Sequence, residues 1–187
     1  MKSKNWVRVL IFFCLSNTII IRSGAQTLND EQIRNQMVRE WERAKAYTIG
    51  YLNTMPANKY GFKAVDSLRS FAQQMLHLAS GNVFLMSRAS MATPPAFSKE
   101  DIEHSPTAQN KDSVMYFVVN SYDYCISALK ALPLDRWGEV IDVFGFKETR
   151  FTMLLKTFEH QSHHRGQTTI YIRLLNIIPP PEGLFQK

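Results

Sequence analysis

Proline divides this 187-residue chain into four long stretches that contain none. Within each stretch apolar side chains recur at spacings of three and four residues, the period that gathers them on one side of an α-helix. Every proline lies in a connection between the stretches or after the last one: Pro56, Pro94, Pro95, Pro106, Pro133, Pro179, Pro180 and Pro181. Because proline lacks a backbone N–H and ends helices, the chain is expected to form four long helices.

Capping residues and prolines set the expected helix bounds. They are a first helix from Thr27 or Asn29 to before Pro56, a second from Asp66 or Ser67, a third over Val114–Leu132, and a fourth from Glu148 or Thr149 to about Ile178. Residues 91–108 are rich in Pro, Ser and Thr and suit a long crossover, while the β-branched and aromatic residues 136–146 suit a short hairpin or a lid. Four long helices, with a long crossover between the second and third, predict an all-α four-helix bundle.

Residues 1–25 have the pattern of a secretory signal peptide. Lys2, Lys4 and Arg8 precede the mostly apolar run 9–21, and small residues follow as far as Ala25, where cleavage is expected. A membrane anchor is the competing interpretation, but polar residues interrupt the run and it is shorter than the ~20 apolar residues of a spanning helix. We therefore expect export to the periplasm or the medium, with no stable membrane anchor after cleavage.

Removal of this segment changes the charge and cysteine counts of the chain. It carries four of the 22 Lys and Arg residues and no acid, which leaves 18 basic residues against 16 acidic ones, a formal net charge of +2. So small a charge does not favour a nucleic-acid partner. Cys125 is then the single remaining cysteine, which excludes an internal disulfide, and it is expected to fill core space together with Trp41 and Trp137.

The fourth expected helix carries two histidines, His160 and His164, on one face and one turn apart. At this spacing two imidazoles can bind one metal ion. His77 lies in the middle of the second helix, on a line of polar and small residues, and completes a three-histidine site if the two helices face each other. Three neutral imidazoles suit an open site for Zn²⁺, and Ni²⁺ fits the same ligands. The alternative is that these histidines are ordinary core or surface residues.

The residues beside the histidines carry weaker expectations. His163 is expected to pair with Glu159, Arg165 to form an ion pair, and Gly166 to mark a close helix contact. Gln167 could bond a metal-bound water or a backbone group. His104 is expected to be solvated near Asp101 and Glu103, with a lid role as the alternative.

The segment Phe71-Ala72-Gln73-Gln74-Met75-Leu76-His77, followed by His160-x-x-x-His164-Arg165-Gly166-Gln167, resembles the DinB-like superfamily. Met55-Pro56, Tyr60-Gly61-Phe62 and Ser67-Leu68-Arg69-Ser70 add to the resemblance. It implies an up-down-down-up bundle over residues 26–178, with residues 179–187 as a tail, and often a homodimer. It also implies a divalent metal, Zn²⁺ or Ni²⁺, on His77, His160 and His164. Relatives include bacillithiol transferases and mycothiol-dependent maleylpyruvate isomerases.

Two classes of function follow from this pattern. The first is an exported metal-dependent thiol S-transferase or hydrolase acting on an unidentified small molecule. Its general acid or base could be Glu159, Glu103, His104 or His163, and no catalytic residue is assigned. The second class is a non-catalytic metal-binding module or scaffold. An enzyme predicts a cavity beside the metal, lined from the crossover and residues 137–146, whereas a structural site predicts a fourth protein ligand.

Overall fold

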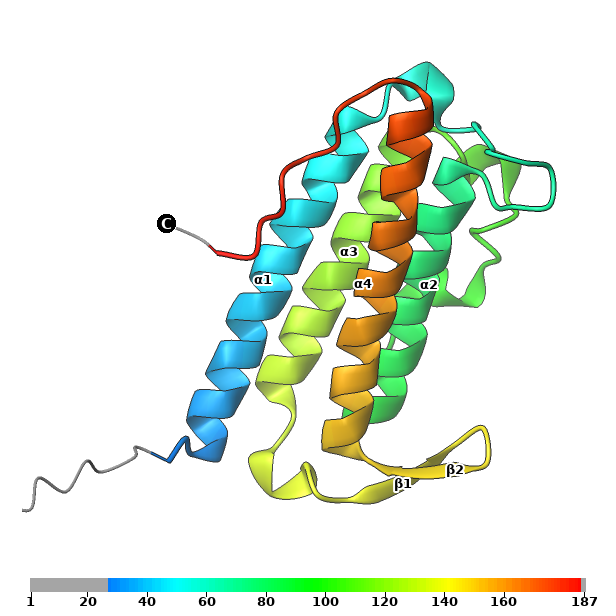
Figure 1. Cartoon of the computed structure of the whole chain (residues 1–187). Coiled ribbons are helices and arrows are strands. Elements are labelled where there is room, and N and C mark those ends of the chain that lie inside the picture. The colour runs from blue at the N-terminus through cyan, green and yellow to red at the C-terminus, as the bar shows by residue number, and fades with distance from the viewer. Residues whose placement is uncertain (1–26, 186–187) are drawn as a thin grey trace, which may run out of the picture.

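Four long helices dominate the computed structural model, which describes residues 27–185 (Figure 1). The elements are α1 (Asp30–Thr54), α2 (Phe71–Ser90), α3 (Lys111–Ala131), β1 (Val140–Val143), β2 (Phe146–Thr149) and α4 (Arg150–Leu174). Short 3₁₀ helices occupy the connections at Ala57–Lys59, Ala96–Lys99, Pro106–Ala108 and Leu134–Arg136. The predicted all-α bundle is confirmed. The predicted signal peptide lies outside the described residues.

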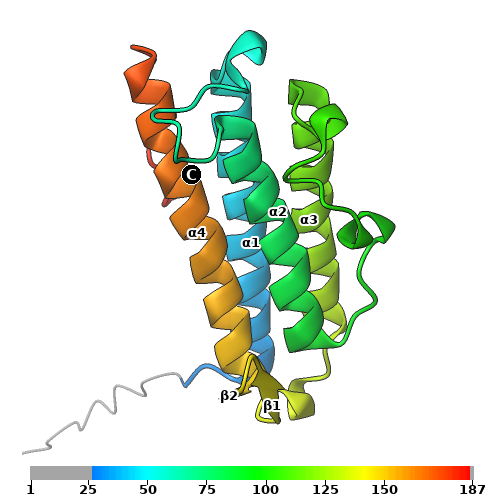
Figure 2. The same cartoon turned by 90° about the vertical axis from the view of Figure 1, so that its right-hand side faces the viewer.

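The helices run up, down, down and up, as expected (Figure 1). In cross-section α2 packs against α3 and α4, and α1 packs against the same two helices on the other side. The pairs α2–α3 and α1–α4 are therefore parallel, and a parallel pair consecutive in sequence needs a long connection. That connection is the crossover, residues 91–110, which returns along the outside of the bundle beside α2 and α3 (Figure 2).

Helix α2 begins later than predicted because of hydrogen bonds at both ends of the loop that precedes it. Ser70, rather than Asp66 or Ser67, is the N-cap: its side chain accepts from the N–H of Gln73, whose side chain bonds back to the N–H of Ser70. The N–H of Phe71 donates to the carbonyl of Phe62 at 3.0 Å. This contact holds residues 63–69 as an exposed loop over the start of α2. The first helix is capped by Asn29, one of its two predicted caps.

The last helix ends at Leu174, not near Ile178 as predicted. Asn176 adopts a left-handed conformation with φ 59°. Its N–H donates to Arg173, and the N–H of Ile177 donates to Ile172. This is the hydrogen-bond pattern of a Schellman motif, in which asparagine can replace the usual glycine. The signal for the end is therefore Asn176 and not the prolines that follow.

Aromatic side chains fill the centre of the bundle. Trp41 is fully buried and meets the rings of Tyr122 and Phe158 edge-on, at centroid distances of 5.7 and 5.4 Å. Such contacts add about 0.5–1.5 kcal/mol each to the burial of the rings. Trp137 and Cys125 are buried too, which confirms their predicted place in the core. Between residues 27 and 185 no helix is long and apolar enough to cross a membrane.

The segment before α4 is the predicted hairpin. Strands β1 and β2 pair antiparallel, with Val143 opposite Phe146. Phe144 and Gly145 form the turn, and both have positive φ, 57° and 82°. A two-residue turn of this kind matches the twist of the strands but is usually made by Asn and Gly. Phe144 stacks on Phe84 of α2, so the hairpin tip lies against that helix.

Candidate metal centre

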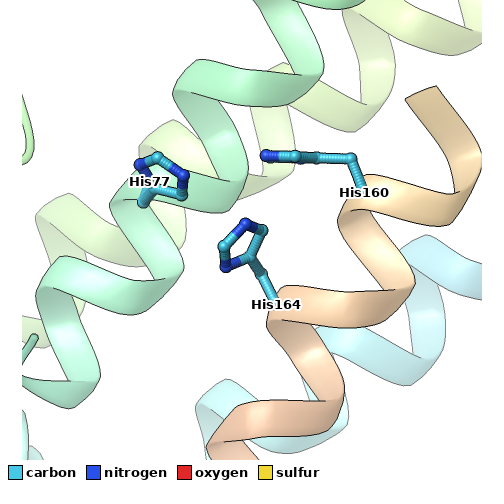
Figure 3. A group of neighbouring side chains, drawn as sticks. All are labelled: His77, His160 and His164. Carbon is cyan, nitrogen blue, oxygen red and sulfur yellow. The ribbon is translucent and has the colours of Figure 1, made fainter. Parts of the chain in front are cut away.

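Three histidine rings meet where α2 packs against α4, the pair of helices in most extensive contact. One nitrogen from each of His77, His160 and His164 lies within 4.8 Å of the others. His160 and His164 leave α4 one turn apart and point toward His77 on α2 (Figure 3). The ring centroids are 4.5 Å apart for His77 and His164, and 4.4 Å apart for His160 and His164. The three residues singled out in the sequence are thus brought together.

The ring of His160 occupies space that a glycine leaves open. A Cβ placed on Gly81 would lie 2.0 Å from Cε1 of His160 and 2.7 Å from both of its ring nitrogens. Gly81 is one helical turn beyond His77, so α2 supplies a ligand candidate and a space for its neighbour from the same face. The close approach predicted for Gly166 is wrong: that residue is exposed, and a Cβ there would meet nothing within 4 Å.

His77 is held from the crossover by Glu103. Nδ1 of His77 lies 2.8 Å from Oε2 of Glu103, and Nε of Arg69 donates to Oε1 of the same carboxylate at 2.6 Å. Burial opposes ionisation of Glu103, but the hydrogen bonds from Arg69 and His77 hold the pKa of this carboxyl below its usual value. The carboxylate is therefore ionised at neutral pH, and in that state it can only accept hydrogen bonds.

His164 is held from α2 by a carboxamide. Nδ1 of His164 lies 2.8 Å from the amide nitrogen of Gln74, and Gln74 also bonds Gln167. Gln167 continues to Nε2 of His163 at 2.8 Å. This line of four side chains runs from the buried His164 to the exposed His163. It replaces the predicted pairing of His163 with Glu159 and gives Gln167 a side-chain partner rather than a backbone one.

The environment keeps two of the three imidazoles neutral. Burial, followed by the charge of His77, lowers the pKa of His160 to about 4. Burial and the neighbouring His160 and His77 lower the pKa of His164 to about 3. A neutral imidazole has a free lone pair, which is the form that binds a metal. At neutral pH these two rings are accordingly ready to act as ligands.

The residues present fit a metal ion. Nδ1 of His160 is buried and has no hydrogen-bond partner among residues 27–185, an uncommon state for a buried polar atom. The three imidazoles provide nitrogen donors alone, and within the described residues no fourth His, Cys, Asp or Glu joins the group. A metal ion held by these three residues would keep a coordination position open for an exchangeable ligand, as in catalytic zinc sites.

A pocket of about 780 Å³ borders this site. It reaches Glu103, Gln74 and Gln167, the groups that hold His77 and His164. Its other walls come from the loop before α2 and from the last turns of α4. The prediction that the crossover would help to line the pocket is confirmed through Glu103 and His104. The prediction for residues 137–146 is wrong, because none of them lines this pocket and the hairpin tip lies instead against Phe84.

The structure also tests the predictions for Arg165 and His104. Arg165 forms no ion pair in the described part of the chain: its guanidinium is buried, donates to Gln161 at 2.6 Å and lies over the ring of Tyr47 at 4.8 Å. His104 is exposed and bonds Asp101 at 2.9 Å, as expected for a solvated residue. Of the four candidate acids and bases, Glu103 bonds a member of the three-histidine group, and the ring of His163 meets that of His164 edge-on at a centroid distance of 4.9 Å.

The roles of Gln74 and Gly81 are not among those predicted from the sequence. Gln74 precedes His77 by three residues, so both lie on one helix face, and this spacing was a usable signal. Gly81 in the middle of a helix was another, because glycine there costs about 1 kcal/mol relative to alanine unless a close contact requires it. The partnership of Glu103 with His77 joins residues from a loop and a helix, and no spacing rule predicts it.

An up-down-down-up four-helix bundle with three histidines facing one another across α2 and α4 defines a class of bundle proteins with a potential metal centre. Residues 26–182 match the DinB family, and the chain belongs to it. A DinB-like protein from Bacillus cereus has the same fold, with a TM-score of 0.69 at 15% identity over 79% of this chain and 96% of that one.

A DinB-like protein from Bacillus subtilis is similar in the same way. It aligns with a TM-score of 0.66 at 18% identity, over 82% of this chain and 100% of its own. At these identities the likeness shows the fold alone. No match was found among curated proteins.

Proposed function

We propose that this DinB-family protein binds one divalent cation through His77, His160 and His164, and uses it in a transferase or hydrolase reaction on a small molecule. The observation that carries the proposal is the convergence of three imidazole nitrogens within 4.8 Å, from two helices, with no fourth ligand in the described chain. Zn²⁺ and Ni²⁺ are the favoured ions, because imidazole nitrogen suits both.

A cation in this site would supply Lewis acidity toward a substrate heteroatom. The protein's own groups keep the ligands in place: Glu103 orients His77, and Gly81 leaves room for the ring of His160. For His164 to bind through Nε2, its Nδ1 must carry the proton. Half-turns of the Gln74 and Gln167 carboxamides together supply that acceptor, because the oxygen of Gln74 then faces Nδ1 of His164 and the side-chain nitrogen of Gln167.

The adjoining pocket is the proposed substrate site. Its lining mixes charges of both signs, from Lys63, Arg69, Asp66 and Glu103, with the apolar side chains of Leu68 and Ile170. Such a surface suits a small polar molecule with an apolar part. Nothing in this lining favours nucleic acid as a partner, because the cationic and anionic groups balance.

Export is part of the proposal and rests on the signal-peptide pattern of residues 1–25. An exported enzyme would meet few of the low-molecular-weight thiols of the cytosol. A substrate screen therefore includes transfer to other acceptors and hydrolysis beside thiol transfer. A homodimer is the proposed assembly, by family resemblance.

Metal analysis of the purified chain without residues 1–25 tests the proposal. We expect about one equivalent of Zn²⁺ or Ni²⁺ after reconstitution and none in His160→Ala. His104→Ala is the matched control for metal content, since His104 is exposed and its hydrogen bonds within the described residues are to Asp101. Absence of stoichiometric metal from the wild-type chain would refute the metal centre. Metal without turnover of thiol-transfer, ester or amide substrates would favour the non-catalytic binding module.

A further inference from the structure

Glu103 belongs to the crossover, yet its side chain is part of the wall around the three histidines. Its side chain is 14% exposed, and both of its oxygens are engaged. Oε2 lies 2.8 Å from Nδ1 of His77, and Oε1 lies 2.6 Å from Nε of Arg69. The carboxylate thus joins a loop before α2, the crossover and α2 itself at one point.

The backbone on each side of this carboxylate is anchored. Ile102 is 1% exposed and sits in the core. The side-chain nitrogen of Gln109 donates to the carbonyl of Glu103 at 2.9 Å and to that of Ser105 at 3.2 Å. Arg69 is anchored as well, because its carbonyl accepts from the hydroxyl of Tyr171 on α4 at 2.8 Å. Glu103 is therefore presented to His77 by a braced loop and not by a free surface side chain.

The chemical consequence lies in the tautomer of His77. A neutral imidazole has one protonated and one free nitrogen. An ionised carboxylate at Nδ1 favours the tautomer with its proton there, which leaves the lone pair on Nε2. With Nδ1 engaged by Glu103, Nε2 is the nitrogen left to bind a metal together with His160 and His164. The hydrogen bond also makes the free nitrogen a stronger electron-pair donor to a metal. Groups that bond a metal ligand in this way change metal affinity by about 10–100-fold.

We propose that Glu103 is a positioning residue of the metal centre, which selects the Nδ1-protonated tautomer of His77 and strengthens metal binding. Arg69 supports it by holding the second carboxylate oxygen. The effect on affinity rests on the proposed metal site, whereas the selection of the tautomer does not. This separates the two ideas experimentally.

Glu103→Gln is the primary variant, because it keeps the shape and removes the charge. Glu100→Gln is its matched control, an exposed glutamate of the same loop with no side-chain hydrogen bond in the described chain. The first measurement is the ring ¹⁵N chemical shifts of His77 in the metal-free proteins, assigned by their loss in His77→Ala. We expect the Nδ1-protonated tautomer to predominate in the wild type and in Glu100→Gln, and a mixture in Glu103→Gln.

The second measurement is the dissociation constant for Zn²⁺ and for Ni²⁺, by competition with a chromophoric chelator. We expect Glu103→Gln to bind about 10–100-fold more weakly than the wild type, and Glu100→Gln to be unchanged. Unchanged affinity in Glu103→Gln, or an Nε2-protonated His77 in the wild type, would overturn the proposal. If the wild type binds no metal, the metal centre fails and the tautomer alone decides the role of Glu103.

Loss of folding would imitate a loss of affinity, so the melting temperature of each metal-free protein is measured alongside. If Glu103→Gln melts well below the wild type, Arg69→Gln replaces it. That variant leaves the bond from Glu103 to His77 in place and removes only its support. Weaker metal binding than in the wild type and in Glu100→Gln is then expected, and a loss no greater than in Glu100→Gln would count against the proposal.

Discussion

The ring of His160 lies over Gly81, so close that a Cβ there would come within 2.0 Å of Cε1. Helix α2 therefore contributes His77 to the candidate site and, because Gly81 has no side chain, also the space for the ring of His160. Residues four apart in an α-helix lie on the same face, so Gly81 faces the same way as His77. A small residue at that position is the condition for a ring from the facing helix to enter.

Gly81→Ala is expected to destabilise the fold and weaken metal binding, because His160 must move. Overpacking of this kind costs about 1–3 kcal/mol. Gly166→Ala is the control: no atom lies within 4 Å of its Cβ position, so the better helix propensity of alanine should stabilise by about 0.5–1 kcal/mol. Urea unfolding and chelator competition measure both effects. Equal stabilisation by the two substitutions would contradict the contact.

Metal removal should lower the melting temperature of the wild-type chain. A ligand that binds only the native state at roughly 100 times its dissociation constant adds about 2.7 kcal/mol to the free energy of unfolding. We expect Zn²⁺ to raise the melting temperature and a chelator to reverse the rise. His164→Ala should show neither change, and His104→Ala should show both. A chelator-insensitive wild type would leave the histidines as packing residues.

Arg165→Lys is expected to destabilise the protein despite conserving charge. The guanidinium donates to Gln161 and Thr48 and lies over Tyr47, and an ammonium cannot reproduce this planar arrangement. Tyr122 still donates to Gln161, so the cost is the loss of hydrogen bonds from a charged group, which contribute about 1.5–3 kcal/mol each. Arg39→Lys, on the exposed surface of α1, should change stability by no more than about 0.5 kcal/mol. Similar unfolding midpoints for the two variants would refute this role.

Acid is expected to lower the free energy of unfolding through Glu139, which lies at the base of the hairpin. Hydrogen bonds from Arg136 and then Arg150 lower the pKa of Glu139 from 4.5 to about 2. Because the folded pKa is the lower one, the stabilisation is complete above pH 4.5 and disappears as the pH falls toward 2. Glu139→Gln should flatten the pH dependence of the unfolding free energy in this range. An unchanged acid profile would show that these arginines do not act through Glu139.

Local sequence determined the helices and most of their ends. Asn29 and Thr149 cap α1 and α4 as predicted, because a cap needs only a side-chain oxygen and the N–H groups two or three residues on. The spacing of His160 and His164 likewise guaranteed that the rings share a face, whatever the rest of the chain does. These are interactions within a few residues, and their geometry is fixed by one helix.

Tertiary structure decided which partners those residues meet. The bond from Glu103 to His77 joins side chains 26 residues apart, and it exists only because the crossover returns beside α2. Gly81, and not Gly166, receives the close contact because α2 turns that face toward α4. The burial of Arg165 without a carboxylate follows from the same packing. Periodicity places a residue on a face, but the neighbouring element on that face is set by how the whole bundle closes.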